Sequence, residues 1–484
     1  AHNNRGNAYR DKGDLDRAMA DYTEALRLDP KNVYANTGRG NVYFDKKDFD
    51  RALSDYNEAI RLDPKYSLAY NNRANLHRDR GDPDRALADY NSAIRLDPKN
   101  ARAYNGRGNL LREKGDSDRA LADYNEAIRV DPKYAWAYNN RANVYRDRRD
   151  LDRALADYSE AARLDPGNSR AFNGRGNVHF DRKDYDRALA DYNESIRLDP
   201  KYAWAYTNRA NLYREKGDVD RAFADYNDAI RLDPKHSRAY NGRANVYKTR
   251  GDLDRALADY NEAIRLDPKF AAAYGNRGIL YRGKRELDRA RADQDEAIRL
   301  DPKDAWSYNN RGNVWRDKGD LDRALTDYNE AVRLDPKYVV GHNNRGLVWL
   351  DKKEYDRALS DFNEAIRLDA KFARAYNNRG DAWREKGDLD RALTDYSEAI
   401  RLDPKYAWVY NDRGLVSFRK KDYDRALADF NESIRLDPRY GWAHNNRGLV
   451  YRDRKENFDK KDCDSALADF DEAIRLDPKN ARAV

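Results

Sequence analysis

The sequence contains a single cysteine, Cys463, among 484 residues, which excludes a framework of disulfide bonds within the chain. Cys463 takes the place of Leu321 in another copy of the repeat described below, which favours a small buried hydrophobic side chain over a reactive thiol. Hydrophobic runs of membrane-spanning length are absent, and no signal peptide is recognisable within these residues. These absences predict a cytoplasmic protein that does not associate with membranes.

The sequence also has little of what catalytic and cofactor sites require. Its six histidines are scattered without a partner at metal-binding spacing, and it has neither a phosphate-binding glycine-rich loop nor a nucleophile elbow. Paired carboxylates such as Asp320 and Asp322 recur in nearly every copy of the repeat, where helix capping explains them. The sequence therefore predicts a protein that is not an enzyme and uses no cofactor or metal.

Neither sign of charge is in large excess, because 94 Lys and Arg residues face 87 Asp and Glu residues for a formal charge of +7. Helical spacing pairs Arg323 with Asp327 and Glu330 with Arg333, and similar pairs in most copies compensate the charge locally. This compensation argues against nucleic acid as the partner. Although 37% of the residues are charged, 36 tyrosines and a sustained helical period argue against disorder.

One segment, Asp320–Lys337, recurs with small changes along the whole chain. Its apolar residues between Leu321 and Val332 step by three and one, which is one face of an α-helix. Asp320 is a suitable N-cap, and Pro336 disfavours helical geometry at the residue before it, so the helix should stop there. The residues that end the copies lie 34 apart, except for a last interval of 40: Pro30, Pro64, Pro98, Pro132, Pro166, Pro200, Pro234, Pro268, Pro302, Pro336, Ala370, Pro404, Pro438 and Pro478. These 14 copies predict a single repeat domain over residues 1–484.

The unit from Ala305 to Tyr338 shows what each copy contains: a first helix from Trp306 to about Lys318, a turn at Gly319-Asp320, and the second helix. Its motif residues are Tyr308, Arg311-Gly312, Trp315, Ala324, Tyr328 and Pro336. This pattern resembles the tetratricopeptide repeat. The resemblance covers the full chain and implies an all-α fold, a right-handed superhelical α-solenoid of tandem helix-turn-helix units. It also implies a non-catalytic scaffold for protein–protein interactions.

One motif position departs from the family, because every copy has arginine where leucine is usual. An aspartate follows 16 residues later in each copy except the last, as Asp327 follows Arg311. A lone buried guanidinium is costly, so we expect an ion pair between the two helices of each unit. Phosphate binding by these arginines is the alternative.

Both ends of the sequence lie within a repeat, and no capping element of the kind that solenoids normally need is visible. Either the sequence is a segment of a longer repeat protein, or molecules associate end to end. Six extra residues, 455–460, fall between the two helices of the last copy. We expect a longer first helix or a protruding loop there.

The polar face of the first helix is rich in asparagine. In the family the first helices line the concave side of the superhelix, so the resemblance implies that this face forms a groove. It looks like the asparagine ladder of family members that hold extended protein segments, because a carboxamide can pair with any peptide backbone. The residues predicted to bind peptide are Asn71, Asn72, Asn75, Asn105, Asn109, Asn139, Asn140, Asn143, Arg146, Asn173, Asn177, Asn208, Asn211, Arg214, Asn309, Asn310, Asn313 and Arg316. The arginines among them would admit acidic peptides, although adjacent acids such as Asp147 offset their charge.

The groove changes along the chain. Between Asn72 and Gly242 the position of Asn310 alternates between asparagine and glycine, so any contacts there would repeat every second unit. Further on, the position of Asn313 becomes Ile279, Leu347, Asp381, Leu415 and Leu449, which predicts a more apolar groove. Trp136, Trp204, Trp306, Trp408 and Trp442 begin first helices, where packing against the preceding unit and stacking on a ligand both remain open.

Three alternatives to peptide binding remain. The asparagines can be solvated residues of a passive scaffold, inherited when the repeats were copied. The molecules can form a structural superhelix through end-to-end stacking of uncapped repeats. Finally, the arginines can bind a polyanion, with a steep dependence on salt.

Overall fold

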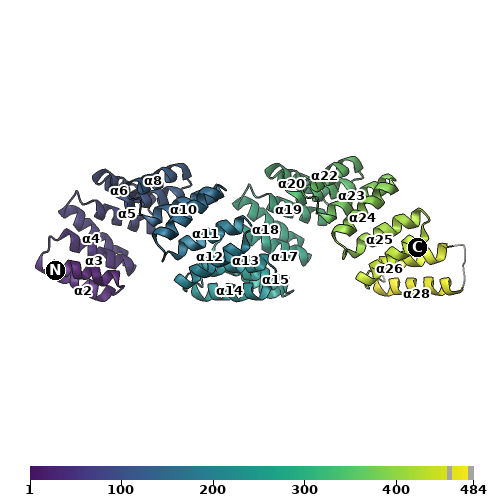
Figure 1. Ribbon diagram of the computed structural model, residues 1–484, viewed down its shortest axis with the longest axis horizontal. Helices are drawn as coiled ribbons and strands as arrows, with labels where there is room; N and C mark the ends of the chain where they lie inside the picture. Colours follow the sequence, from purple (N-terminus) through teal and green to yellow (C-terminus); the bar gives the residue numbers. More distant parts are fainter. Residues whose placement is uncertain (455–459, 478–484) are drawn as a thin grey trace. The chain divides into compact units, whose positions relative to one another are not determined.

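The computed structural model describes residues 1–454 and 460–477, and helices joined by short turns are the regular structure of these residues. Within each compact unit of the chain, consecutive helices pair as antiparallel hairpins in which an odd-numbered first helix precedes an even-numbered second helix (Figure 1). The chain divides into two compact units, Ala1–Val246 and Tyr247–Val484. The prediction of an all-α hairpin-repeat solenoid is confirmed in each unit, whereas a single domain over residues 1–484 stays a prediction.

The helices of the first unit are α1 (His2–Asp11), α2 (Leu15–Leu28), α3 (Val33–Asp45), α4 (Phe49–Leu62), α5 (Ser67–Asp79), α6 (Pro83–Leu96), α7 (Ala101–Glu113), α8 (Ser117–Val130), α9 (Ala135–Asp147), α10 (Leu151–Leu164), α11 (Ser169–Asp181), α12 (Tyr185–Leu198), α13 (Ala203–Glu215), α14 (Val219–Leu232) and most of α15 (Ser237–Thr249). Those of the second unit are α16 (Leu253–Leu266), α17 (Ala271–Gly283), α18 (Leu287–Leu300), α19 (Ala305–Asp317), α20 (Leu321–Leu334), α21 (Val339–Asp351), α22 (Tyr355–Leu368), α23 (Ala373–Lys386), α24 (Leu389–Leu402), α25 (Ala407–Arg419), α26 (Tyr423–Leu436), α27 (Gly441–Asp453) and α28 (Lys460–Leu476).

The turn between α19 and α20 has the chemistry that the sequence predicts. In the unit of α19 and α20, Gly319 has a φ of 81°, the left-handed conformation that follows many helices. The Asp320 carboxylate then accepts a hydrogen bond from the backbone N–H of Arg323 at 3.0 Å, and α20 ends at Leu334, two residues before Pro336. The predicted cap, turn and helix end are therefore confirmed.

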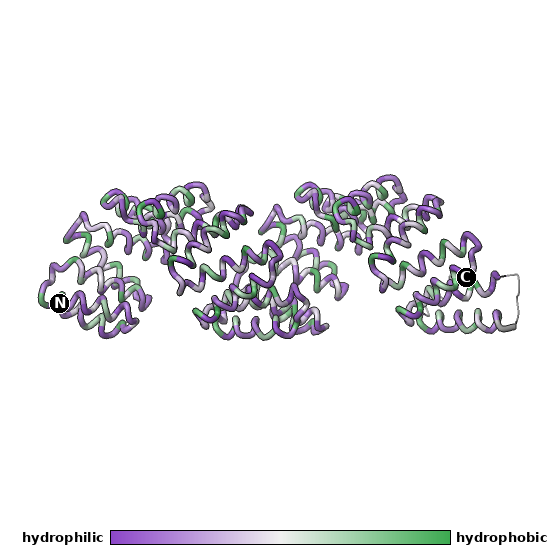
Figure 2. The backbone as a smooth tube through the Cα atoms, viewed as in Figure 1, coloured by the Kyte–Doolittle hydropathy of each residue, from purple (hydrophilic) through white to green (hydrophobic). Residues whose placement is uncertain are grey.

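The core repeats from hairpin to hairpin. Tyr158 of α10 is 1% exposed and packs with Ala142 of α9, Ala154 of its own helix and Val178 of α11. This aromatic side chain therefore packs against both helices of its own hairpin and against the first helix of the next hairpin. Each repeat consequently depends on its neighbours to bury its core. Hydrophobic residues are spaced along each helix rather than gathered in runs (Figure 2).

Successive first helices also contact one another, as α5 contacts α7 in the first unit and α25 contacts α27 in the second. Their polar faces therefore form a continuous strip within each unit, which we call the first-helix face. No helix in the described ranges is long and apolar enough to cross a membrane.

Three sequence predictions need comment. Arg323 pairs with Asp320 at 2.6 Å and not with Asp327, which is already bound by Arg311 of the first helix. Cys463 is half-buried in α28 rather than buried. Most of the insertion at 455–460, Pro478 and the start of a fifteenth copy at 481–484 lie outside the described residues.

Candidate functional site

The predicted ion pair between the two helices of a repeat is confirmed. Arg379 of α23 donates two hydrogen bonds to Asp395 of α24, at 2.8 Å from Nε and 2.7 Å from Nη2, and Asp395 is 4% exposed. The same paired bonds recur from Arg5 and Asp21 to Arg447 and Asp469. Hydrogen bonding to Arg5 lowers the pKa of Asp21 to about 2.

The same arginine also joins neighbouring repeats, which the sequence analysis did not foresee. Arg379 donates from Nη1 to Asn363 of the preceding second helix at 2.6 Å, and Arg141 donates likewise to Asn125 at 2.7 Å. Each such guanidinium is bound on two sides by protein acceptors. Little donor capacity is left for a phosphate, which argues against the polyanion alternative.

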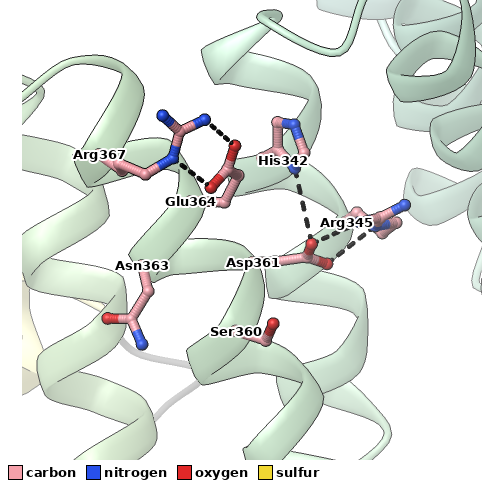
Figure 3. Close-up of a pocket in the computed structure, with 7 residues that line it drawn as sticks. All are labelled: His342, Arg345, Ser360, Asp361, Asn363, Glu364 and Arg367. Carbon is pink, nitrogen blue, oxygen red and sulfur yellow. Dashed lines mark hydrogen bonds and ion pairs between the residues drawn. The ribbon is translucent and has the colours of Figure 1, made fainter.

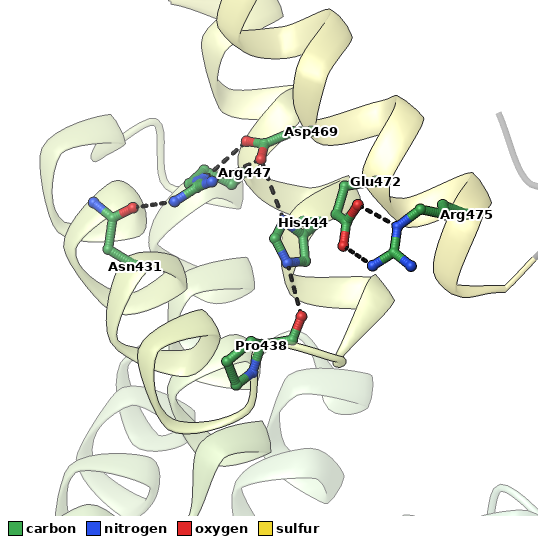
Figure 4. Close-up of polar contacts among 7 residues, drawn as sticks. All are labelled: Asn431, Pro438, His444, Arg447, Asp469, Glu472 and Arg475. Carbon is green, nitrogen blue, oxygen red and sulfur yellow. Dashed lines mark hydrogen bonds and ion pairs between the residues drawn. The ribbon is translucent and has the colours of Figure 1, made fainter.

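Two histidines extend this network in the second unit. Where other repeats have a tyrosine whose hydroxyl donates to a backbone carbonyl, as Tyr410 does to Pro404 at 3.4 Å, α21 has His342 and α27 has His444. His444 lies with Nε2 3.3 Å from the Pro438 carbonyl and Nδ1 3.3 Å from Asp469, the partner of Arg447 (Figure 4). Both ring nitrogens of His444 therefore lie near an acceptor.

His342 has the same surroundings, with Nε2 3.1 Å from the Pro336 carbonyl and Nδ1 3.7 Å from Asp361. It borders a pocket of about 480 Å³ whose charged groups pair with one another, because Arg345 binds Asp361 and Arg367 binds Glu364 (Figure 3). Among the described residues, no group of histidine, cysteine and acidic side chains could hold a metal ion. The Arg and acidic side chains of this pocket therefore neutralise one another within the scaffold.

The position of His342 predicts a pH-dependent stability. The neighbouring Asp361 carboxylate, 3.7 Å from Nδ1, raises the pKa of His342 above its ordinary value, so the protonated ring stabilises the folded state fully at pH below that ordinary value, about 6.5. This contribution is lost as the pH rises through the folded-state pKa. We therefore expect the urea midpoint of the wild type to exceed that of His342→Tyr by more at pH 6 than at pH 8. An equal difference at both pH values would contradict this assignment.

The predicted peptide-binding residues all lie on first helices, but their exposure differs. The buried ones are Asn71, Asn105, Asn139, Asn173, Asn309 and Asn310. The half-buried ones are Asn72, Asn75, Asn109, Asn140, Asn143, Arg146, Asn177, Asn208, Asn211, Asn313 and Arg316, and Arg214 is exposed. The first-helix face is thus less exposed than a solvated scaffold surface would be.

Some of these asparagines bond to one another across repeats. Asn140 of α9 donates from Nδ2 to Oδ1 of Asn105 in α7 at 2.9 Å, and Asn208 donates likewise to Asn173. In the alternate junctions glycine replaces the donor, and the tyrosine of the preceding repeat lies against it. A Cβ on Gly106 would be 2.5 Å from Cε1 of Tyr90. The alternation of asparagine and glycine therefore corresponds to two types of junction between successive repeats. In one type two asparagines are hydrogen-bonded, and in the other a tyrosine ring packs against a glycine.

A third set of asparagines is bound by tyrosine. The Tyr192 hydroxyl donates to Oδ1 of Asn177 at 2.8 Å, and the Tyr124 hydroxyl donates to Asn109 at 2.8 Å. Where leucine replaces this asparagine, phenylalanine replaces the tyrosine: Leu347 with Phe362, Leu415 with Phe430, and Leu449 with Phe470. The joint replacement was readable in the sequence, and it marks these asparagines as partners of the core tyrosines.

Two of the predicted peptide-binding arginines pair with the following repeat. Arg146 of α9 binds Asp181 of α11 at 2.8 Å, and Arg316 of α19 binds Asp351 of α21 at 2.9 Å. The predicted pairing with an adjacent acid is found at Arg78 with Asp79 and at Arg452 with Asp453, whereas Arg146 pairs with Asp181 rather than with Asp147. Because Arg146 and Arg316 already have carboxylate partners, the case for an acidic peptide is weaker than the number of arginines suggests.

The tryptophans divide into two groups. Trp306 fills the space above Gly275 of the preceding repeat, so packing explains it. Trp136, Trp204, Trp408 and Trp442 are between 38% and 52% exposed. In the first unit the Arg170 guanidinium lies 5.4 Å from the ring centre of Trp136, a cation–π contact.

Comparisons with known proteins agree with this geometry. Models described as "Tetratricopeptide repeat" match residues 71–135, 139–203, 207–269, 243–305 and 407–440. A model described as "TPR repeat" matches residues 6–46, 40–77, 312–352 and 380–421. No curated protein matches the sequence.

Two solved structures illustrate the similarity in fold. The crystal structure of the APC/C hetero-tetramer Cut9-Hcn1 contains a chain that is 18% identical, with a TM-score of 0.59 over 92% of this chain and 95% of that one. A tetratricopeptide repeat protein from Parabacteroides merdae is 24% identical, with a TM-score of 0.42 over 54% of this chain and 98% of its own. At this level of identity the first similarity concerns the fold alone.

Proposed function

This chain belongs to the tetratricopeptide repeat family, and on that premise we propose that it is a non-catalytic scaffold that binds extended peptide segments along the first-helix face. In the first unit the contact residues would be the half-buried amides and the exposed tryptophans of the first helices. The partners are other proteins, because a repeated backbone-reading surface suits an extended polypeptide.

The orientation of four amides carries this proposal. In Asn75, Asn109, Asn177 and Asn211, a core tyrosine hydroxyl donates to Oδ1 and so fixes the carboxamide. None of these four Nδ2 groups has a hydrogen-bond partner in the described part of the chain. Each half-buried amide can therefore donate to the carbonyl of a bound peptide, and the repeat sets the spacing of these donors.

The amide donors can be removed without leaving a buried hydroxyl unsatisfied. The variant Asn109→Leu/Tyr124→Phe/Asn177→Leu/Tyr192→Phe introduces the leucine–phenylalanine pair that other repeats of this chain already contain. We expect it to fold like the parent. We also expect it to lose at least tenfold in affinity for a captured partner, because several hydrogen bonds of the complex are absent.

The test is affinity capture from an extract of the native cells at moderate salt, with parent and variant compared. Mass spectrometry would identify retained proteins, and absorbance would report nucleic acid. Proteins retained by the parent and lost by the variant would support the proposal. Equal capture by both, retention of nucleic acid alone, or capture of further copies of the chain alone would contradict it.

A further inference from the structure

The first-helix face changes in charge at one place in the second unit. Asp381 of α23 stands where Asn313 stands in α19, and Asp412 of α25 stands where Asn310 stands. Both carboxylates are mostly buried, with side chains 20% and 22% exposed. An isolated pair of buried carboxylates is costly, so their surroundings matter.

One guanidinium serves three carboxylates here. Arg384 lies 3.2 Å from Asp381, 3.5 Å from Asp412 and 3.4 Å from Glu385. The Tyr396 hydroxyl also donates to Asp381 at 2.8 Å. Burial and the neighbouring Asp381 raise the pKa of Asp412 to about 7, as is usual for carboxylates that lack sufficient positive charge.

A buried acceptor also lacks a donor at this place. Asn377 is 7% exposed, its Nδ2 donates to Asp381 at 3.4 Å, and its Oδ1 has no hydrogen-bond partner. In the adjacent junctions this oxygen is bound, because Asn378 donates to Asn343 at 2.8 Å and Asn446 donates to Asn411 at 2.9 Å. Asp412 occupies the place of that donor, and a carboxyl group has no N–H to give in place of the asparagine Nδ2.

Exposed aromatic rings flank the acidic residues. Trp408 lies one helical turn before Asp412 on the same face of α25 and is 52% exposed. Trp442 takes the same place in α27 and is 46% exposed. An indole face attracts a cation, and its area can cover the aliphatic part of a long basic side chain.

We propose that Asp381, Asp412 and the Oδ1 atom of Asn377 form a subsite for a basic side chain, lysine or arginine, of a peptide that lies along the first-helix face. The nitrogen of that side chain supplies the N–H donors that these acceptors lack, and its positive charge offsets the excess of carboxylates around Arg384. Its aliphatic stem lies on Trp408. This inference rests on the proposed function and names the chemistry of the partner: a peptide with a basic residue.

The test uses two labelled peptides, one of alternating lysine and alanine and one of alternating glutamine and alanine, with fluorescence anisotropy at low salt. The wild type should bind the lysine peptide at least tenfold more tightly. The variant Asp381→Asn/Asp412→Asn should remove this preference, because both charges are gone. It should also fold, since Asn313 stands at the position of Asp381 in an earlier repeat, and Asn378 and Asn446 stand at the position of Asp412 in the two neighbouring repeats.

A matched control removes two carboxylates elsewhere. Asp390 and Asp424 begin the second helices α24 and α26, and their side chains are 84% and 83% exposed. Asp390→Asn/Asp424→Asn should bind the lysine peptide within twofold of the wild type, because exposed charges are screened. If this control loses as much affinity as Asp381→Asn/Asp412→Asn, only the net charge matters and the subsite is disproved.

Other outcomes separate the inference from the proposed function. A wild type that binds both peptides equally overturns the basic subsite, even if the amide variant still loses its partners in the capture experiment. Conversely, if the wild type prefers the lysine peptide but the amide variant captures the same proteins as the parent, the subsite is supported and peptide binding by the four amides is contradicted.

Discussion

Replacement of Asp157 by alanine is expected to lower the free energy of unfolding by about 3 kcal/mol, because it leaves a mostly buried guanidinium without its carboxylate. Asp157 is 6% exposed and accepts bonds from Arg141 at 2.7 and 2.8 Å. Repeat arrays open locally, so the loss should concentrate in α9, α10 and their neighbours. Urea unfolding would measure the total effect, and hydrogen exchange would locate it.

The matched variant Arg141→Leu/Asp157→Ala removes the cation together with its partner. Leucine is the usual family residue at this position, and Asn125, which loses its bond from Arg141, is exposed and can bond to water. The double variant should therefore recover most of the lost stability, because replacing both members of a buried ion pair by apolar groups is often nearly neutral. If it is as unstable as the single variant, the uncompensated charge is not the cause.

Replacement of Asn177 by leucine alone is expected to destabilise the protein by about 2 kcal/mol, because the hydroxyl of Tyr192 loses its acceptor. That tyrosine is 1% exposed, so water cannot readily replace the carboxamide. Chemical unfolding followed by circular dichroism would give the difference in free energy.

The double variant Asn177→Leu/Tyr192→Phe should regain most of this stability, since the second change removes the hydroxyl. Leu415 and Phe430 show that the chain accommodates this pair at the same two positions. A single variant as stable as the wild type would show that the Tyr192 hydroxyl finds another partner, and the proposed fixing of the amide would then lose its support.

Features within one repeat were predictable because the repetition of the sequence exposes them. The predicted first helix from Trp306 to about Lys318 corresponds to Ala305–Asp317, and the arginine–aspartate pair follows from its constant spacing. The pairing of Arg323 with Asp327 was wrong because helical spacing alone does not reveal that another helix has already bound that aspartate.

Features between repeats were not predictable in the same way, because they depend on the rotation from one hairpin to the next. The bond of Arg146 to Asp181 and the stacking of Arg170 on Trp136 join residues of different repeats. The asparagines on the first-helix face were identified as candidates from residue type, but their burial was not visible in one helix alone. That these asparagines bind a peptide stays a proposal.

The alternation of junction types has a consequence for how the gene can change in length. Tyr90 packs against Gly106 of the next repeat. Deletion of a single repeat between α5 and α14 would place an asparagine, such as Asn140, where such a tyrosine now contacts glycine. Deletion of two successive repeats would keep a glycine opposite this tyrosine, because the alternation recurs every second repeat. Within this part of the chain, recombination in steps of two repeats should therefore be tolerated more readily than recombination in steps of one.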